Sequence, residues 1–247
     1  MTMHRADRGP GRAATGVISV PLAHRGLAST GSPIPAAENT LEAFSRSAAA
    51  GYGCELDVRL AADGVPVVVH DAAIVASDGS RTRIDRMTVE ELERLGVPTL
   101  RAALQTLSDR PIIVELKQPR VRVGRLEAAV LAVLDADARG RADLAVASFN
   151  PWTLAWFARN APDLLRALTV GRVATRTVLS AAVVRWVRPD VLSVAVDIVG
   201  RRRVRALRRR RPVLCWTVRD AQDLGRVRLL ADNVIFEGTL DQRVVAA

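Results

Sequence analysis

The feature that most constrains the fold is a regular alternation of short apolar, β-branched runs with segments of helical period. This alternation is typical of parallel strands covered by helices. Eight strand-like runs follow one another, near residues 17–22, 53–58, 111–117, 143–149, 165–170, 191–196, 212–217 and 233–236. Eight parallel strands close a barrel, and 247 residues is an ordinary length for one. We therefore predict an α/β fold, a (β/α)8 TIM barrel.

Helical segments lie between several of these strands. The predicted helices cover residues 40–50, 88–95, 100–107, 125–136, 151–160 and 176–187. Asn39 or Thr40 is placed to cap the first of them, with Glu42 in its first turn. Glu38 is interpreted as part of the same helix start.

The composition indicates one globular domain without a membrane span. The hydrophobic fraction of 49% can fill a large core, and no apolar run approaches the ~18 to 20 residues of a membrane helix. Residues 1–16 are polar and lack the apolar stretch of a secretory signal. We expect a disordered tail at 1–16, one domain at 17–247 and a cytoplasmic location. Cys54 and Cys215 are isolated in apolar runs, so no disulfide framework or metal cluster is expected.

The formal net charge of +10 favours an anionic partner, whether nucleic acid, an acidic membrane surface or a phosphorylated substrate. The densest basic run, residues 201–211, has the pattern of a helix with an apolar stripe at Val204 and Leu207. A solvated outer helix is the simpler interpretation. Aromatic residues make up only 4% of the chain and none lies in this run, which weakens a model of base stacking. We do not expect a nucleic-acid partner. The alternative is an arginine-rich barrel that binds nucleic acid and serves only as a scaffold.

One strand-like run, residues 66–70, follows the second barrel strand without an intervening helix. Asp63-Gly64 stands between the two, which is a signal for a two-residue hairpin loop. That loop would add a short hairpin strand after the second barrel strand and set Asp57 opposite His70. Side chains in such a pair have Cβ atoms about 4.5 to 5.5 Å apart. We therefore expect His70 to share a site with Asp57.

The strand period brings three carboxylates to one place. Glu55 and Asp57 are two apart on a strand and point to the same face. Glu115 and Lys117, the only lysine of the chain, share a face of the third barrel strand. His24 follows the first strand, so these groups gather at the carboxyl end of the barrel, where barrel enzymes place their chemistry.

This grouping predicts a metal site with proton-transfer groups around it. Three converging carboxylates repel one another unless they are protonated or bind a cation, and oxygen ligands suit one Mg²⁺ or Ca²⁺. The expected ligands are the carboxylates of Glu55, Asp57 and Glu115. Two histidines, His24 and His70, can exchange a proton near neutral pH. Arg25 and Lys117 suit a phosphate, and the whole set supplies what phosphoester cleavage requires.

The series of motifs resembles the glycerophosphodiester phosphodiesterase family of TIM barrels. The motifs are His24-Arg25-Gly26, Glu55-Leu56-Asp57, His70-Asp71, Pro98-Thr99-Leu100, Glu115-Leu116-Lys117, Ser148-Phe149-Asn150-Pro151 and Cys215-Trp216-Thr217-Val218. The resemblance implies hydrolysis of a glycerophosphodiester to an alcohol and glycerol 3-phosphate. It implies that His24 and His70 act as acid and base, and that the three carboxylates hold the metal. Arg25 and Lys117 would then bind the phosphate.

Four further positions are candidates for the site. Asn39, Asp71 and Glu237 are candidates for rim or orienting groups, and Trp216 for either barrel core or a platform under the substrate. Glu237 departs from the family pattern, whose last strand ends in a Gly-Ile-Ile-Thr-Asp-like run. The alternative function is therefore a related barrel phosphodiesterase or lyase that acts on a lysophospholipid or a sphingolipid.

Overall fold

The structure is a computed structural model, which describes residues 16–28, 38–75, 79–117, 123–138, 141, 143–173 and 175–238, without the side chains of 175 and 176. Apart from its last residue, Gly16, the predicted tail at 1–16 lies outside these residues, as does the end of the chain after residue 238.

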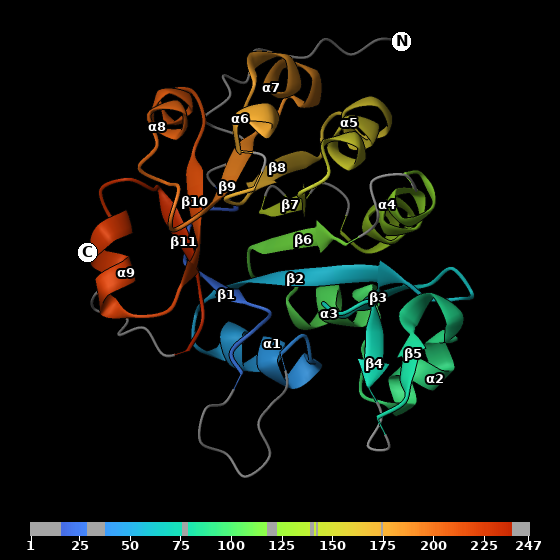
Figure 1. The fold of residues 1–247 in the computed structure, drawn as a ribbon. Helices are drawn as coiled ribbons and strands as arrows, with labels where there is room; N and C mark the ends of the chain where they lie inside the picture. Colours follow the sequence, from blue (N-terminus) through green and yellow to red (C-terminus); the bar gives the residue numbers. More distant parts are fainter. Residues whose placement is uncertain are drawn as a thin grey trace.

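Eight parallel strands form a closed barrel with helices around it (Figure 1). They are β1 (Leu22–His24), β2 (Gly53–Leu60), β6 (Ile112–Leu116), β7 (Leu144–Ser148), β8 (Leu165–Val170), β9 (Val191–Ala195), β10 (Val213–Val218) and β11 (Asn233–Phe236). The barrel closes because β1 pairs with β2 on one side and with β11 on the other. The predicted (β/α)8 fold is confirmed.

The helices of the described residues follow the predicted places in most cases. They are α1 (Leu41–Ala49), α2 (Val89–Arg94), α3 (Leu100–Thr106), α4 (Arg125–Asp137), α5 (Pro151–Asn160), α6 (Thr175–Val178), α7 (Ala181–Val187), α8 (Arg202–Arg208) and α9 (Ala221–Val227). The single helix predicted at 176–187 is wrong, because Ser180 interrupts it and caps α7 by accepting the N–H of Val183. Helix α9 was not predicted; Asp220 caps it through the N–H of Asp223.

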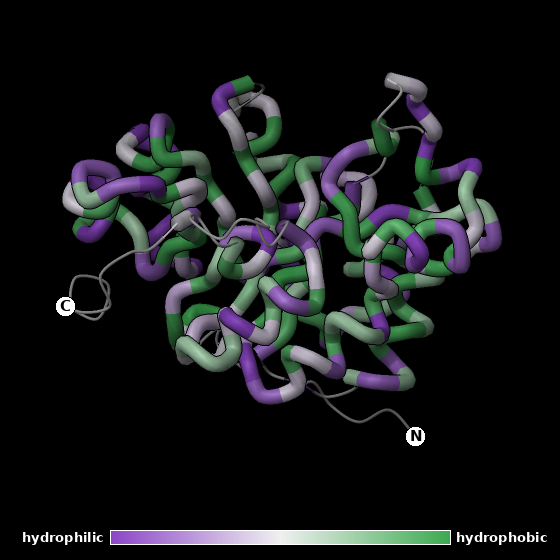
Figure 2. The backbone as a smooth tube through the Cα atoms, turned by 90° about the horizontal axis from the view of Figure 1, so that it is seen from below, coloured by the Kyte–Doolittle hydropathy of each residue, from purple (hydrophilic) through white to green (hydrophobic). Residues whose placement is uncertain are grey.

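Alternate strand residues separate two apolar clusters. Ile112, Val114 and Leu116 of β6 pack outward with the helices. Ile113 of the same strand packs inside the barrel with Leu22 and other small or branched side chains. Figure 2 shows hydrophobic segments concentrated toward the middle of the molecule and hydrophilic ones frequent at its edge. The inner face of β6 therefore continues into the barrel mouth with Glu115, as the period-two pattern predicts.

The first strand lies later in the chain than predicted. β1 begins at Leu22, where the prediction ended, and His24 is its last residue rather than the residue beyond it. The β-branched run before it forms a turn, in which Ser19 donates to the Gly16 carbonyl. Val17 is fully buried within the inner cluster. This run therefore contributes an apolar side chain to the barrel interior instead of a ladder of hydrogen bonds.

The hairpin strand exists, but its predicted register is wrong by one residue. β3 (Pro66–Val68) pairs antiparallel with β2, with Val58 opposite Val68. The loop has three residues, 62–64, and Gly64 adopts φ +84° at its end, as three-residue hairpin loops require. The Val69 N–H donates to the Asp57 carbonyl, at 2.9 Å. Asp57 is consequently opposite Val69 and not opposite His70.

A second hairpin that the sequence did not predict lies beside β3 (Figure 1). β4 (Ala73–Val75) and β5 (Arg81–Arg83) pair antiparallel, and the 3-10 helix η1 (Ile84–Arg86) follows. Ile84 of η1 and Leu92 of α2 pack with Val67 of β3 in one buried apolar cluster. Within the described part of the chain, no helix has both the length and the apolar character needed to cross a membrane.

Candidate active site

Three buried carboxylates meet inside the mouth of the barrel. Glu55 and Asp57 lie on β2 and Glu115 on β6, with Asp57 directly across from Glu115 in the parallel register. The side chains are almost fully buried, and one oxygen from each lies within 4.8 Å of the others. The predicted trio is therefore brought together, and the strand period is the reason.

The electrostatics of this trio call for a cation. Burial, together with the neighbouring charges of Asp57 and Glu115, raises the pKa of Glu55 well above its ordinary value. Burial also raises the pKa of Glu115. For Asp57, burial is outweighed by the charges of Lys117 and Arg25, so its pKa is lowered. Such a cluster stays fully ionised only if more positive charge is added.

Two cationic side chains already reach the carboxylates. The Lys117 ammonium lies 3.0 Å from Asp57 Oδ1 and 2.5 Å from Glu115 Oε1. The Arg25 Nε lies 2.9 Å from Asp57 Oδ2, and its Nη1 lies 2.5 Å from Glu38 Oε1. Glu38 is thus a partner of Arg25 and not merely the start of a helix.

The loop after β1 is held tightly to β2. The Arg25 N–H donates to the Glu55 carbonyl at 2.8 Å, and the Asn39 N–H donates to the Arg25 carbonyl at 2.8 Å. The Asn39 side chain donates to Asp57 Oδ2 at 3.0 Å and accepts the Asp57 N–H at 3.3 Å. Gly26 has φ +83°, and a Cβ there would lie 2.8 Å from Ala43. This loop therefore needs a glycine at that position.

His24 lies between two carboxylates. Its Nε2 is 3.7 Å from Glu55 Oε2, and its Nδ1 is 2.6 Å from Glu237 Oε1. Burial and the charge of Arg25 lower the pKa of His24 against the opposing effect of Glu237. Burial therefore favours the neutral form of the imidazole.

Glu237 has a second partner that sequence reasoning missed. Arg219 Nε lies 2.8 Å from Glu237 Oε2. Arg219 follows β10 directly, and Glu237 follows β11. A charged residue just after each of two adjacent parallel strands was the signal available in the sequence.

The side-chain contact of His70 is with its neighbour in the chain, Asp71. In the described structure its side chain is half-exposed, and its recorded contact is between Nδ1 and Asp71 Oδ1, at 2.9 Å. Its backbone carbonyl accepts a hydrogen bond from Arg59 Nε, at 2.8 Å. Arg59 Nη1 also donates to the Lys117 carbonyl, at 3.2 Å. Arg59, which was not singled out from sequence, therefore ties the residue after β6 to His70.

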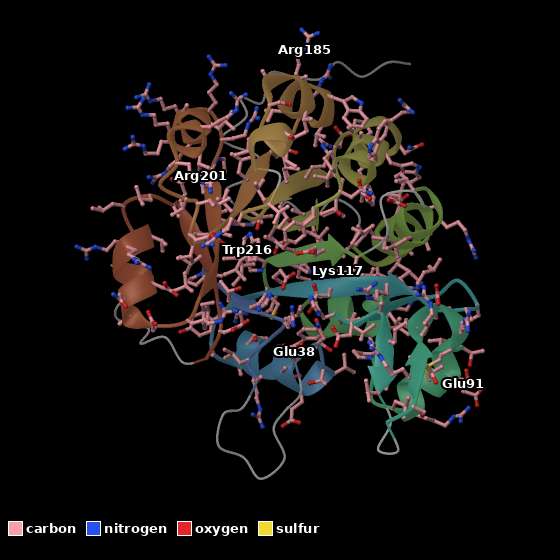
Figure 3. All side chains as sticks on the ribbon, in the orientation of Figure 1. Glu38, Glu91, Lys117, Arg185, Arg201 and Trp216 are labelled. Atoms are coloured by element: carbon pink, nitrogen blue, oxygen red, sulfur yellow. The ribbon has the colours of Figure 1, made fainter. Side chains whose placement is uncertain are left out.

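Aromatic rings line another side of the mouth. Trp216 points inward from β10 and meets Phe149 edge to face, with 5.4 Å between the ring centroids. The Lys117 ammonium lies 5.6 Å from the Phe149 centroid. Figure 3 shows Trp216 and Lys117 toward the middle of the barrel, whereas Arg185 points away from it. Trp216 therefore lies where both of its interpretations, barrel core and substrate platform, require it to lie.

The arginine-rich helix has the predicted form of an outer helix. Val204 of α8 is fully buried in the outer core, while Arg202 and Arg205 are exposed. Arg208 pairs with Asp232 across 3.0 Å.

The cysteines, Cys54 and Cys215, are buried and free, and burial raises the pKa of each thiol to about 12.

Fold and site together define a (β/α)8 barrel with a buried acidic centre flanked by cationic side chains. Residues 24–237 match the family model described as the glycerophosphoryl diester phosphodiesterase family, so the chain belongs to this family.

Curated relatives match over parts of their length. A glycerophosphodiester phosphodiesterase of Caldanaerobacter subterraneus is 29% identical over 58% of this chain and 63% of the relative. A probable glycerophosphodiester phosphodiesterase 2 of Mycobacterium tuberculosis is 31% identical over 40% of this chain and 38% of the relative. The chain thus spans less than two thirds of the length of these relatives.

Solved structures match over nearly the whole barrel. The glycerophosphodiester phosphodiesterase of Thermotoga maritima gives a TM-score of 0.70 at 28% identity, covering 87% of this chain and 92% of that one. An Oleispira antarctica phosphodiesterase, solved in complex with the product sn-glycerol-3-phosphate, gives a TM-score of 0.73 at 21% identity, over 89% and 93% of the two chains. The second likeness is one of fold alone.

Proposed function

We propose that this chain hydrolyses glycerophosphodiesters to an alcohol and glycerol 3-phosphate, with a divalent cation and with histidine acid/base catalysis. The observation that carries the proposal is the convergence of Glu55, Asp57 and Glu115, within 4.8 Å of one another, beside His24 and two cationic side chains. Family membership and the likeness to the Thermotoga enzyme support the substrate class.

The donor set fits a hard divalent cation, Mg²⁺ or Ca²⁺. All the donors are carboxylate oxygens, which these ions prefer. Glu55 Oε2 is buried and accepts no hydrogen bond from the described residues, so its lone pairs are available to a cation. Glu55, Asp57 and Glu115 would hold the ion, which when bound polarises a phosphoryl oxygen and neutralises developing charge.

The side chains of the chain itself would bind the phosphate and move protons. Arg25 and Lys117 would bind the phosphoryl oxygens, because each already points its charge at the carboxylate centre. One of the two histidines, His24 or His70, would accept the proton of the nucleophile, and the other would donate a proton to the leaving alcohol. Asn39 would hold Asp57, Asp71 would orient His70, and Trp216 would offer an apolar face to the glycerol of the substrate.

We also propose that residues 17–247 act as one catalytic domain on a small-molecule substrate. The contact between His24 and Glu237 joins the first and the last strand of the barrel at its mouth. The cytoplasmic location stays a prediction from the sequence.

The test is release of glycerol 3-phosphate from glycerophosphocholine by purified protein with Mg²⁺, with Ca²⁺ or with EDTA. Release that depends on either cation supports both the reaction and the cofactor. A cyclic phosphate product would instead support the lyase alternative, because an internal hydroxyl then replaces water as the nucleophile. No product from folded protein with either cation would contradict the assignment of glycerophosphodiesters as substrates.

A further inference from the structure

Two side-chain contacts at the barrel mouth, Arg219 with Glu237 and Glu237 with His24, connect to a histidine of the proposed mechanism. We propose that Glu237, anchored by Arg219, is a positioning residue that fixes the ring orientation and the tautomer of His24. Only the expected effect on turnover rests on the proposed function; the expected effect on the His24 ring does not.

The backbone places Glu237 beside His24. In the parallel register of β1 and β11, Ala23 lies opposite Phe236. The next residues along the chain are His24, the last of β1, and Glu237, which directly follows β11. The Glu237 N–H donates to the Val218 carbonyl at 3.0 Å, which docks the end of β11 on β10. This hydrogen bond fixes the Cα position from which the carboxylate reaches the ring.

Both oxygens of Glu237 are held. Oε2 lies 2.8 Å from Arg219 Nε, and Oε1 lies 2.6 Å from His24 Nδ1 and 3.5 Å from Arg219 Nη2. Arg219 therefore restrains the rotation of the carboxylate, and the carboxylate in turn restrains the imidazole. A single exposed ion pair contributes little to stability, but a carboxylate held at both oxygens has a defined direction.

The hydrogen bond decides which ring nitrogen of His24 bears the proton. An ionised carboxylate only accepts hydrogen bonds, so Nδ1 must carry the hydrogen. The opposite nitrogen, Nε2, then presents its lone pair toward Glu55 Oε2, 3.7 Å away, on the side of the carboxylate centre. Without Glu237 the ring would be free to adopt the other tautomer or to rotate, and Nε2 would no longer be ready to accept a proton there.

The chain provides a matched control on the neighbouring strands. Asp197 follows β9 and lies 2.6 Å from Arg172 Nε, which follows β8. The side chains of Asp197 and Glu237 are exposed to the same degree, 37% and 35%. The recorded partner of Asp197 is an arginine and not a histidine, so a change there tests the loss of a rim ion pair by itself.

The first test observes the ring directly and needs no substrate. Nitrogen-15 NMR of histidine-labelled protein is recorded at about pH 8.5, well above the ordinary imidazole pKa of about 6.5. It is repeated with EDTA and with Mg²⁺, and His24→Gln assigns the signal. We expect His24 in the Nδ1–H tautomer in the wild type and in Asp197→Asn, and a shift toward Nε2–H in Glu237→Ala. An unchanged His24 signal in folded Glu237→Ala overturns the proposal.

The second test separates positioning from a general loss of structure. Glu237→Ala and the milder Glu237→Gln are expected to lower kcat by roughly 10-fold to 100-fold, with little change in KM, because misdirection of one group costs on this order. Arg219→Ala should cause a smaller loss, and Arg219→Lys should restore most of it. In a His24→Ala background, removal of Glu237 should cause no further loss, because it acts through that ring.

The outcomes distinguish this proposal from the proposed function. If the wild type releases glycerol 3-phosphate and Glu237→Ala does so equally fast, positioning is refuted while the hydrolase assignment stands. If the losses from Glu237→Ala and His24→Ala add, Glu237 acts elsewhere and the proposal also fails. If the wild type is inactive on every glycerophosphodiester, the tautomer measurement still decides whether Glu237 controls His24.

Discussion

Asp57 and Glu115 lie opposite each other on adjacent parallel strands, and the Lys117 ammonium contacts both, at 3.0 Å and 2.5 Å. This relationship places a fixed positive charge beside two of the three proposed metal ligands. The third, Glu55, has no such ammonium contact in the described structure, and burial raises its pKa most clearly. Glu55 is therefore the carboxylate whose ionisation depends most on a bound cation.

The first prediction concerns metal-linked stability. Ca²⁺ or Mg²⁺ should raise the Tm of the wild type, because a bound ion stabilises the folded state. The free energy of unfolding rises by about 2.7 kcal/mol when the free ion is at about 100 times its Kd. Glu55→Gln should abolish this rise while leaving the Tm in EDTA equal or higher, because the amide removes a carboxylate that burial disfavours in the charged form. Thermal melts with each cation and with EDTA measure both effects.

Glu42→Gln is the control, because Glu42 is exposed and pairs with Arg46 on the surface of α1. It should keep the full metal-dependent rise. A rise of wild-type size in Glu55→Gln would contradict the ligand assignment of Glu55.

The second prediction concerns the two histidines. His24→Ala and His70→Ala should each lower turnover by roughly 10² to 10⁴ with folding intact, the usual range for loss of a general acid or base. Metal affinity, measured by calorimetry, should change little in His70→Ala, because the recorded contact of that side chain is with Asp71. Turnover at the wild-type rate in either folded variant would remove that histidine from the mechanism.

The third prediction concerns the loop that carries Arg25. Gly26→Ala should destabilise the fold by about 1 to 3 kcal/mol and lower activity, because φ is +83° and the new Cβ would lie 2.8 Å from Ala43. Gly64→Ala shares the positive φ, +84°, but has open space around the new Cβ. Urea unfolding should show the smaller loss for Gly64→Ala, and equal losses would mean that the contact with Ala43 has no effect.

The sequence predicted those parts of the fold that depend on local period. Alternation along β2 and β6 placed Glu55, Asp57 and Glu115 on one face, and the structure brings them together. The predicted register of β3 failed for an identifiable physical reason. Asp63-Gly64 fits a three-residue loop as well as a two-residue one, and the choice shifts every partner of β3 by one.

The contacts at the barrel mouth could be predicted only in part from a single sequence. Arg219 and Arg59 are two arginines in a chain with 36 basic residues, so their residue type alone does not single them out. The partner of Arg219 lies 18 positions away and those of Arg59 lie 11 and 58 positions away, and the contacts depend on how neighbouring strands end. Glu237 stood out in the sequence as a departure from the family pattern, but its contact with His24 spans 213 positions and required the closed barrel.

The last prediction concerns Arg59, which joins the backbone after β3 to the backbone after β6. Its Nε and Nη1 donate to the carbonyls of His70 and Lys117, so one planar fork sets the relative position of a proposed acid/base group and a proposed phosphate ligand. Arg59→Lys keeps the charge but cannot make both hydrogen bonds in that geometry. We expect a fall in kcat of roughly 10-fold or more for Arg59→Lys, with the metal-dependent rise in Tm retained. Arg94→Lys, at an exposed residue paired with Glu90 on α2, should leave kcat unchanged. Equal kcat values for the Arg59 and Arg94 variants would show that the fork does not position either group.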